Sequence, residues 1–160
     1  MNKILTIEEA IKIAKKIKRQ RKSIVLAGGC FDILHKGHIE FLRMAKKQGD
    51  KLFVILESDE KIKQLKGKDR PLNSQTERAK ILSSLESVDY LIPLPLFTKN
   101  NDYDNLVNLL KPDIIATTKN DSYRKHKERQ ANILGIRVVD VIERIPNKSS
   151  SRLYKMIKHL

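Results

Sequence analysis

Short apolar runs alternate along this chain with longer polar segments that have a helical period. The apolar runs are SIVLAG, KLFVILES, VDYLIPL, PDIIATT and IRVVDVI, starting at residues 23, 51, 88, 112 and 136. The segments between and after them carry apolar residues three or four apart, which is typical of amphipathic helices: HIEFLRMAKKQ, SQTERAKILSSLES, YDNLVNLLK, SYRKHKERQANILG and SSSRLYKMIKHL. Near-continuous apolar strands joined by helices are typical of a parallel sheet covered on both faces. The sequence therefore predicts a single-domain α/β fold, a doubly wound, Rossmann-like sheet of five parallel strands.

One more amphipathic helix is predicted before the first apolar run, in residues 6–20. Thr6 and Glu9 have the spacing of a capping box, and isoleucines and alanines then recur on one helical face. We expect residues 1–22 to form an N-terminal helix that packs on one domain formed by residues 23–160.

Charge and cysteine content limit the partners and the compartment. The 160 residues hold 33 Lys and Arg against 19 Asp and Glu, a formal charge of +14 that attracts phosphates, nucleic acid or an anionic surface. Cys30 is the single cysteine, which excludes an internal disulfide and suits a reducing compartment. The first twenty residues lack the apolar centre of a signal peptide, and there is no apolar run long enough to span a bilayer. We expect a cytoplasmic protein without a membrane partner.

Two polar segments are candidate site loops. Residues 59–73 (DEKIKQLKGKDRPLN) follow the second predicted strand, and residues 117–130 (TTKNDSYRKHKERQ) follow the fourth. In open α/β sheets a ligand binds beyond the carboxyl ends of the strands, and both segments leave the sheet there.

The stretch GGCFDILHKGH, directly after the first strand, has the composition of a phosphate site. Gly28 and Gly29 allow a tight turn and a close approach of the backbone to a ligand. His35 and His38 are three apart at the start of the next helix, so they point to one side, with room left by Gly37. Two imidazoles beside the amides and positive dipole end of a helix make an anion site, and phosphate is the expected anion.

Other interpretations of this stretch are weaker. The fingerprints G-x-G-x-x-G and G-x-x-x-x-G-K-[ST] are absent, so it is neither a dinucleotide motif nor a P-loop. Asp32, His35 and His38 are all possible metal ligands, but zinc helices carry histidines four apart with a glutamate beside the first. A metal site and two incidental histidines at a helix start remain as alternatives.

The same stretch resembles the signature G-x-F-D-x-x-H-x-G-H of the cytidylyltransferase-like nucleotidyltransferases. The matching positions are Gly29, Phe31, Asp32, His35, Gly37 and His38. The leading helix, LKGKDRPLN, TERAKIL and SSSRLYKMI are similar to the adenylyltransferase domain that makes nucleotide-activated heptose. Glycerol-3-phosphate cytidylyltransferases and archaeal FAD synthetases share the signature.

The resemblance implies an enzyme that transfers a nucleoside monophosphate from ATP or CTP to a small phosphorylated acceptor and releases pyrophosphate, with Mg²⁺. AMP from ATP and a sugar 1-phosphate are the first expectation. A cytidylyltransferase acting on a phosphorylated alcohol or sugar, or FAD synthetase-like transfer to FMN, is the alternative. By the same resemblance a homodimer is expected.

The resemblance also implies a set of site residues. His35 and His38 would hold the phosphates and stabilise charge on the α-phosphorus oxygens, Lys66 and Arg70 would contact triphosphate or acceptor, and Arg78 would grip a phosphate with its fork. The expected catalytic residues are thus His35, His38, Lys66 and Arg78; the expected phosphate-binding residues are Gly28, Gly29, Cys30, Phe31, Asp32, Gly37, Arg70, Ser149, Ser150 and Ser151.

Several of these positions have a plainer alternative. Arg78 as a surface partner of Glu77 or Glu86 and the serine triplet as a helix cap are the alternatives for those residues. Asp32 either bonds its own loop or lies near the metal, and protein ligands to a metal stay unknown. A catalytic Cys30 thiol is not expected, because the sequence places no activating histidine beside it.

Two departures from the heptose enzymes concern the substrate. Their Gly-Gly-Asp-Tyr stretch is replaced by TTKNDSY at residues 117–123, and their Asn-Ser-Asp appears as Glu57, Ser58 and Asp59, which puts an extra carboxylate near the expected mouth of the site. Acceptor and base are therefore open.

A function of another class is kept beside the enzyme. Basic runs at residues 15–22 and 123–130 are compatible with a nucleic-acid-binding or nucleotide-sensing module without transferase activity. Aromatic residues for base stacking are scarce, with no Trp, four Phe and four Tyr, so nucleic acid is the weaker expectation.

Overall fold

The computed structural model describes residues 2–159 and contains one five-stranded parallel sheet in the order β3-β2-β1-β4-β5. The strands are β1 (Ile24–Gly29), β2 (Lys51–Leu56), β3 (Tyr90–Pro93), β4 (Ile114–Thr118) and β5 (Arg137–Ile142). Every neighbouring pair is parallel. The predicted doubly wound, Rossmann-like α/β fold is confirmed, and each strand matches the apolar run that predicted it, with β1 one residue longer at Gly29.

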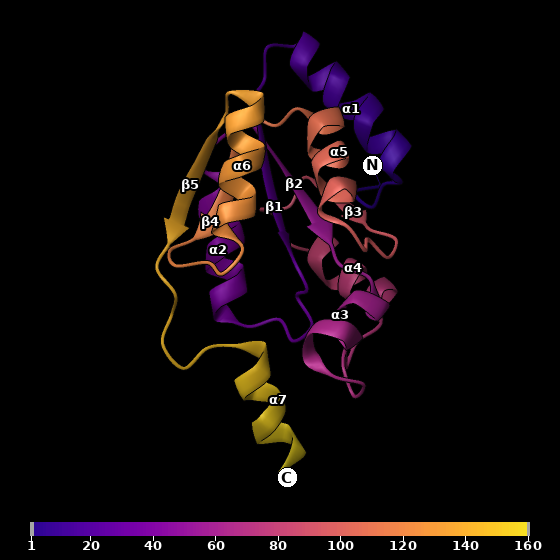
Figure 1. Ribbon diagram of the computed structural model, residues 1–160, viewed down its shortest axis with the longest axis vertical. Helices are drawn as coiled ribbons and strands as arrows, with labels where there is room; N and C mark the ends of the chain where they lie inside the picture. The colour runs from indigo at the N-terminus through magenta and orange to yellow at the C-terminus, as the bar shows by residue number, and fades with distance from the viewer. Residues whose placement is uncertain (1, 160) are drawn as a thin grey trace.

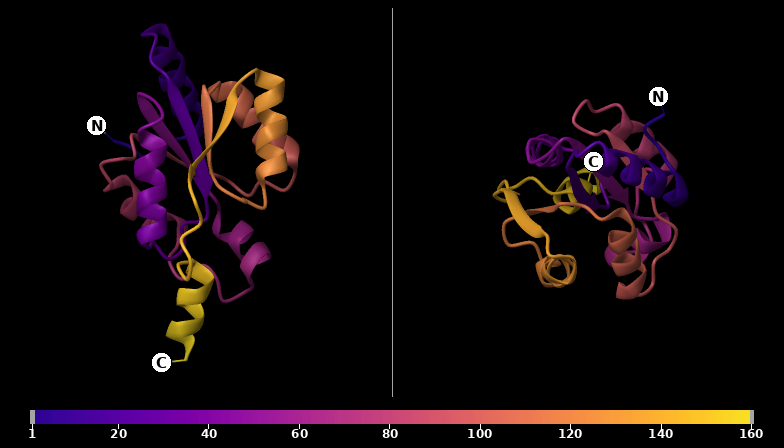
Figure 2. Two further views of the ribbon diagram at one scale, coloured as in Figure 1. Left: turned by 90° about the vertical axis from the view of Figure 1, so that its left-hand side faces the viewer. Right: turned by 90° about the horizontal axis from the view of Figure 1, so that it is seen from above.

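Helices cover both faces of this sheet (Figure 1, Figure 2). They are α1 (Ile7–Arg19), α2 (Lys36–Lys46), α3 (Asp59–Lys66), α4 (Gln75–Ser83), α5 (Asn100–Leu110), α6 (Arg124–Leu134) and α7 (Ser150–Lys158). The left view of Figure 2 shows α2 and α6 on opposite sides of the sheet. Helices α3 and α7 lie at the carboxyl ends of the strands, at the bottom of Figure 1.

The sheet is buried on both faces because its strands are apolar at consecutive positions. In β1, Val25 and Ala27 join the cluster that packs on α2 and α4, whereas Ile24 and Leu26 join the cluster that packs on α1, α5 and α6. All four are at most 3% exposed. Successive side chains of a strand point to opposite faces of the sheet, so both sets are buried when a layer of helices covers each face.

Helix α1 belongs to the second of these clusters. Its capping box is present, with the Glu9 N–H donating to Thr6 Oγ1 and the Thr6 N–H to Glu9 Oε2. Just before it, the Leu5 N–H donates to the Leu91 carbonyl, so the chain start extends the sheet beside β3. The division into residues 1–22 and 23–160 stays a prediction, and the described contacts join the two parts in one core.

Residues 59–73 differ from the loop that their polarity predicts, because the first half is helix α3. Ser58 accepts a hydrogen bond from the Lys61 N–H as N-cap, and Ile62 is fully buried. One anchored apolar residue and a good cap are sufficient for a helix that carries little helical periodicity. Residues 67–73 form the loop.

Candidate nucleotide-binding site

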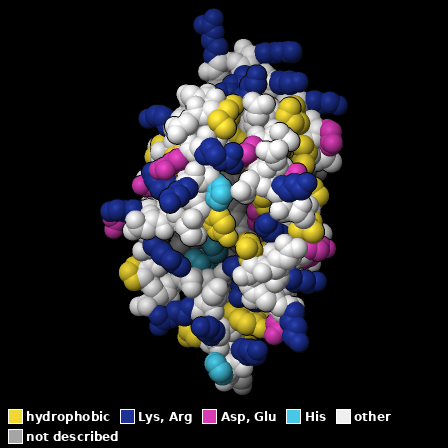
Figure 3. Space-filling model, viewed as in Figure 1, with side chains coloured by type: hydrophobic (Ala, Val, Ile, Leu, Met, Phe, Trp, Pro, Cys, Tyr) yellow, Lys and Arg dark blue, Asp and Glu magenta, His cyan; other side chains and the backbone are white. Residues whose placement is uncertain are grey.

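A cavity of about 430 Å³ opens at the carboxyl edge of the sheet. Its walls come from the segment after β1, the start of α2, the end of α3, the segments after β4 and β5, and the start of α7. The expected residues that line it are Gly28, Gly29, Cys30, Phe31, His35, Gly37, His38, Lys66, Ser149, Ser150 and Ser151. In Figure 3 a recess on this face contains histidine side chains and is bordered by lysines and arginines.

The two glycines at the end of β1 serve packing and not the turn. Both are within the strand, and a Cβ on Gly28 would lie 2.7 Å from Ile55 Cγ1, while one on Gly29 would lie 3.0 Å from the Phe31 ring. The chain turns at Phe31, whose φ is +46°. The expectation that the glycine pair makes the turn is therefore wrong. Left-handed backbone is unfavourable for a bulky residue, and it is held here because the Phe31 ring is buried against His38, 5.1 Å between ring centroids.

The two histidines lie side by side, as the spacing predicted. His35 is the N-cap of α2, and its Nδ1 accepts a hydrogen bond from the Gly37 N–H at 3.1 Å. The rings of His35 and His38 stack with their centroids 3.9 Å apart. Since His35 Nδ1 is an acceptor, the neutral ring carries its proton on Nε2 and keeps that N–H for another partner.

Both rings are held in the neutral form. Burial lowers the pKa of His38 to about 3, and the neighbouring His35 and Lys66 act in the same direction. Burial, Lys148 and Lys66 lower the pKa of His35. At neutral pH the pair therefore offers hydrogen-bond donors without charge, and two uncharged rings stack without repulsion.

Gly37 leaves room for the His35 ring, as the sequence indicated. A Cβ at Gly37 would lie 2.9 Å from His35 Cε1 and 3.0 Å from Nδ1. Gly37→Ala should therefore displace the His35 ring and lower kcat at least tenfold, although alanine in a helix stabilises by ~0.5–1 kcal/mol. Steady-state kinetics and thermal unfolding on the same sample check this; full activity in a folded variant would contradict the close contact.

Lys66 and the serine triplet also line the cavity, and Lys66 contacts one of the serines. Lys66 Nζ donates to Ser150 Oγ at 3.0 Å, and burial lowers the pKa of Lys66. Ser149 caps α7, with its hydroxyl accepting from the Arg152 N–H. The helix-cap alternative thus applies to Ser149 while all three serines also line the cavity.

Cys30 lines the cavity as a protonated thiol. Burial raises the pKa of its side chain. A protonated thiol is a poor nucleophile, in line with the expectation that Cys30 is not catalytic.

Asp32 and Arg70 form a buried ion pair and are absent from the described cavity lining. Arg70 Nε donates to Asp32 Oδ2 at 2.5 Å, and the Leu72 N–H donates to Oδ1 at 2.8 Å. The Asp32 and Arg70 side chains are 0% and 3% exposed. The structure therefore favours the loop-bracing alternative for Asp32, and Arg70 lies away from the position expected for a triphosphate contact.

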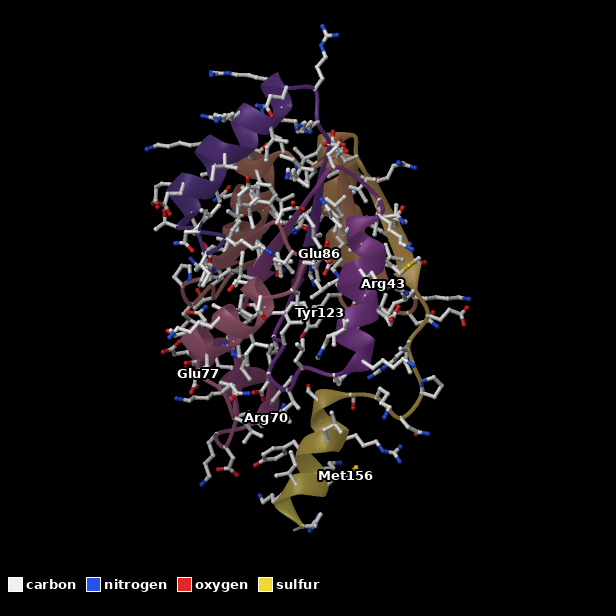
Figure 4. All side chains as sticks on the ribbon, turned by 180° about the vertical axis from the view of Figure 1, so that it is seen from behind. Arg43, Arg70, Glu77, Glu86, Tyr123 and Met156 are labelled. Carbon is white, nitrogen blue, oxygen red and sulfur yellow. The ribbon has the colours of Figure 1, made fainter. Side chains whose placement is uncertain are left out.

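Arg78 is likewise a structural residue. Its side chain is fully buried and donates to the carbonyls of Cys30, Glu57 and Asn73 and to Asp59 Oδ1. The prediction that Arg78 binds a phosphate is therefore wrong, and so is the alternative of a surface ion pair with Glu77 or Glu86. The guanidinium instead bonds to the backbone at the ends of β1 and β2. In Figure 4 Arg70 lies beside α7.

Four further basic residues line the cavity: Lys119 and Lys127, which lie in the candidate site loop of residues 117–130, and Arg144 and Lys148, which were not singled out from the sequence. Lys127 Nζ pairs with Asp121 Oδ2 at 2.8 Å and donates to Thr117 Oγ1 at 2.9 Å. The available signal was their position after β4 and β5, at the edge where ligands bind. In the glycine-free TTKNDSY segment, Asn120 supplies the left-handed turn with φ +61°, which asparagine tolerates.

The carboxylate expected near the mouth of the site lies against α5. Tyr103 donates its hydroxyl to Glu57 Oε1 at 2.9 Å, and burial raises the pKa of Glu57. Ser58 caps α3 and Asp59 pairs with Arg78. These residues are absent from the described cavity lining.

The described cavity residues could accommodate a divalent ion that enters bound to a triphosphate, but they do not form a metal site of their own. Within residues 2–159, no group of three or more His, Cys, Asp or Glu side chains is arranged to hold a metal. Asp121 is the acidic member of the described lining, and it is paired with Lys127. Mg²⁺ commonly keeps several waters and is held by substrate phosphates, which needs no protein cage.

None of the described helices is long and apolar enough to cross a bilayer.

Comparison with known proteins agrees with this geometry. A family model described as cytidylyltransferase-like matches residues 26–157. The bifunctional protein HldE of a Nitratiruptor species is 40% identical over 141 residues, covering 88% of this chain and 29% of the relative. The bifunctional protein HldE of Campylobacter fetus subsp. fetus is 38% identical over 156 residues, covering 98% of this chain and 31% of the relative. The chain thus spans less than a third of the length of these curated relatives.

Two solved structures are similar as well. The lipopolysaccharide core biosynthesis protein from Thermoplasma volcanium GSS1 has 33% identity and a TM-score of 0.62, covering 77% of this chain and 97% of that one. The pantoate-beta-alanine ligase from Francisella tularensis has a TM-score of 0.70, 18% identity, and coverage of 95% of this chain and 72% of that one, which shows the fold alone. With the stacked histidines, the basic cavity and a family model that matches most of its length, the chain belongs to the cytidylyltransferase-like family of nucleotidyltransferases.

Proposed function

We propose that the protein transfers AMP from ATP to a small sugar phosphate and releases pyrophosphate. The observation that carries the proposal is the pair of neutral, stacked imidazoles at the start of α2, facing a cavity whose other walls are basic. Such a pair suits a phosphorus centre that gains negative charge during the reaction.

The residues fit the chemistry of this transfer. Attack at the α-phosphorus spreads charge over its equatorial oxygens, and preorganised N–H donors at those oxygens lower the barrier. His35 and His38 would donate there, while Lys66 and the amides at the start of α7 would hold the remaining phosphate oxygens. A phosphate monoester with its second pKa near 6 is mostly dianionic at neutral pH, so the acceptor needs no general base.

A divalent ion, Mg²⁺ in this proposal, would add charge neutralisation on the leaving pyrophosphate. Lys119, Arg144 and Lys148 line the same cavity and would share that neutralisation as fixed positive charges. A cytoplasmic setting, expected from the lone cysteine, and a dimeric state stay predictions.

The choice of ATP and of a sugar phosphate rests on similarity. The HldE relatives match over nearly the whole chain, and a solved relative at 33% identity is described as a lipopolysaccharide core biosynthesis protein. Lipopolysaccharide cores are built from sugars, which makes a sugar phosphate the acceptor class to test first.

The experiment is a pyrophosphate-release assay with each nucleoside triphosphate and a panel of phosphate monoesters, in Mg²⁺. We expect release with ATP and a sugar 1-phosphate. Release with CTP and a phosphorylated alcohol would replace the adenylyltransferase by a cytidylyltransferase. No release with any pair, from protein that unfolds cooperatively, would contradict transferase activity, and tight salt-sensitive binding to RNA or DNA in that sample would point to the binding module.

A further inference from the structure

Helix α7 stands apart from the layered body of the protein. It extends beyond the carboxyl ends of the strands, and the views of Figures 1 and 2 agree on this. Within α7, Ser150 is the buried residue, while Met156 and Ile157 are 61% and 51% exposed. The helix is therefore not fixed by a hydrophobic core, although its first residues line the cavity.

The contacts that fix α7 come from one face of the helix. Ser150 Oγ accepts from Lys66 Nζ at 3.0 Å, the Tyr154 ring centroid lies 4.6 Å from the Arg70 guanidinium carbon, and Lys158 Nζ lies 3.7 Å from Asp69 Oδ2. Residues four apart share a helical face. Their partners all lie in residues 66–70, so this short segment is the support for α7.

Arg70 is the central member of that support. Its side chain is 3% exposed, and it pairs through Nε with Asp32 of the histidine-bearing stretch. Its Nη2 is buried with no hydrogen-bond partner among the described residues. The guanidinium lies over the Tyr154 ring, which is therefore a main contact of this side chain besides Asp32. A planar guanidinium stacks on an aromatic face, and the attraction is larger when the pair is desolvated.

The other two contacts are weaker constraints. Both side chains of the Lys158–Asp69 pair are more than half exposed, and such pairs contribute little. The Lys66–Ser150 contact is one hydrogen bond. The stack of Tyr154 on Arg70 is thus the contact that links the orientation of α7 to Asp32, in the stretch that leads into His35 and the start of α2.

We infer that Tyr154 is a positioning residue: stacked on the Asp32-bound Arg70, it holds the start of α7 so that Ser149–Ser151 line the same cavity as the two histidines. The role in catalysis rests on the proposed nucleotidyl transfer. The structural part, that the stack holds α7 in place, does not.

The test compares Tyr154→Leu with Tyr154→Phe. Leucine removes the stack, whereas phenylalanine keeps an aromatic face on Arg70. Hydrogen exchange followed by mass spectrometry should give on the order of tenfold faster exchange in residues 150–158 for Tyr154→Leu, and wild-type exchange for Tyr154→Phe. With an active substrate pair, Tyr154→Leu should raise the KM for the triphosphate about tenfold, with rescue in Tyr154→Phe.

Two further variants sharpen the comparison. Met156→Ala removes an exposed side chain of the same helix and should match the wild type in both measurements. Arg70→Lys keeps a positive charge for Asp32 and loses the planar stack, so it should reproduce the faster exchange of Tyr154→Leu.

Each outcome bears on one idea. Equal exchange in α7 for the leucine, phenylalanine and wild-type proteins would overturn the inference. Faster exchange in α7 with unchanged KM would overturn the positioning role and leave α7 merely anchored. If the wild type releases no pyrophosphate with any pair, the proposed function fails, while the exchange comparison still decides the anchoring of α7.

Discussion

We expect replacement of His38 by alanine to lower kcat for nucleotidyl transfer by a factor on the order of 10²–10³, the loss typical of a single donor to a developing oxyanion. The reason is that the ring stacks on His35 with 3.9 Å between centroids and lines the cavity in its neutral form. An interaction made in the transition state lowers kcat and kcat/KM together. Pyrophosphate release under saturating substrates, followed for the variant and the wild type, measures this.

A test of His35 needs a substitution that preserves the N-cap of α2. As that N-cap, His35 accepts from the Gly37 N–H, and alanine would remove that bond together with the ring. His35→Asn keeps a good cap residue, so the helix start is preserved and the imidazole alone is lost. A similar loss of kcat is expected for it, with wild-type thermal stability.

His126→Ala is the matched control for both histidines. His126 is exposed on α6 and does not belong to the described cavity lining, so its variant should retain wild-type kcat. If His38→Ala and His35→Asn are folded and as active as His126→Ala, the histidine pair has no part in the transition state. If they lose activity only because they unfold, the pair is structural.

The fold was predictable from the sequence because strand burial and helix capping are local properties. The five apolar runs give five strands, and Thr6 with Glu9 and Ser74 with Glu77 form the capping boxes that start α1 and α4. Helix α3 was missed because a single buried residue, Ile62, fixes it, which leaves no periodic pattern to detect.

The site residues were predictable where the motif itself lines the cavity. They were not predictable where a charged side chain is buried in the core and bonds to other parts of the protein. His35, His38, Gly37 and the serines are near the cavity because they begin helices at the carboxyl edge of the sheet. An arginine in a polar stretch carries no sign of burial, so nothing in the sequence opposed the phosphate-binding roles that the family resemblance implied for Arg70 and Arg78. Their partners, Asp32 and the backbone carbonyls at the ends of β1 and β2, are set by the tertiary fold.

Arg78→Met should lower the free energy of unfolding by about 3–5 kcal/mol, as expected when one partner of a buried charged network is removed. The guanidinium joins the end of β1 through Cys30, the end of β2 through Glu57, and the loop through Asn73. Methionine fills part of the volume but leaves those carbonyls without a donor, and each unsatisfied buried group costs about 1–3 kcal/mol. Urea unfolding with a two-state fit gives the value.

Lys80→Met separates this role from the alternative of a phosphate ligand. Lys80 is exposed on the same helix, so its variant should stay within about 0.5 kcal/mol of the wild type. If Arg78 bound a phosphate of the substrate, Arg78→Met would leave the unfolding curve unchanged and raise the KM for the triphosphate. A structural link would instead shift the curve strongly and lower activity in proportion to the unfolded fraction. Because Arg78 bonds the backbone on which the histidine-bearing loop begins, the second result is expected, and the site depends on this arginine without contact between its guanidinium and the substrate.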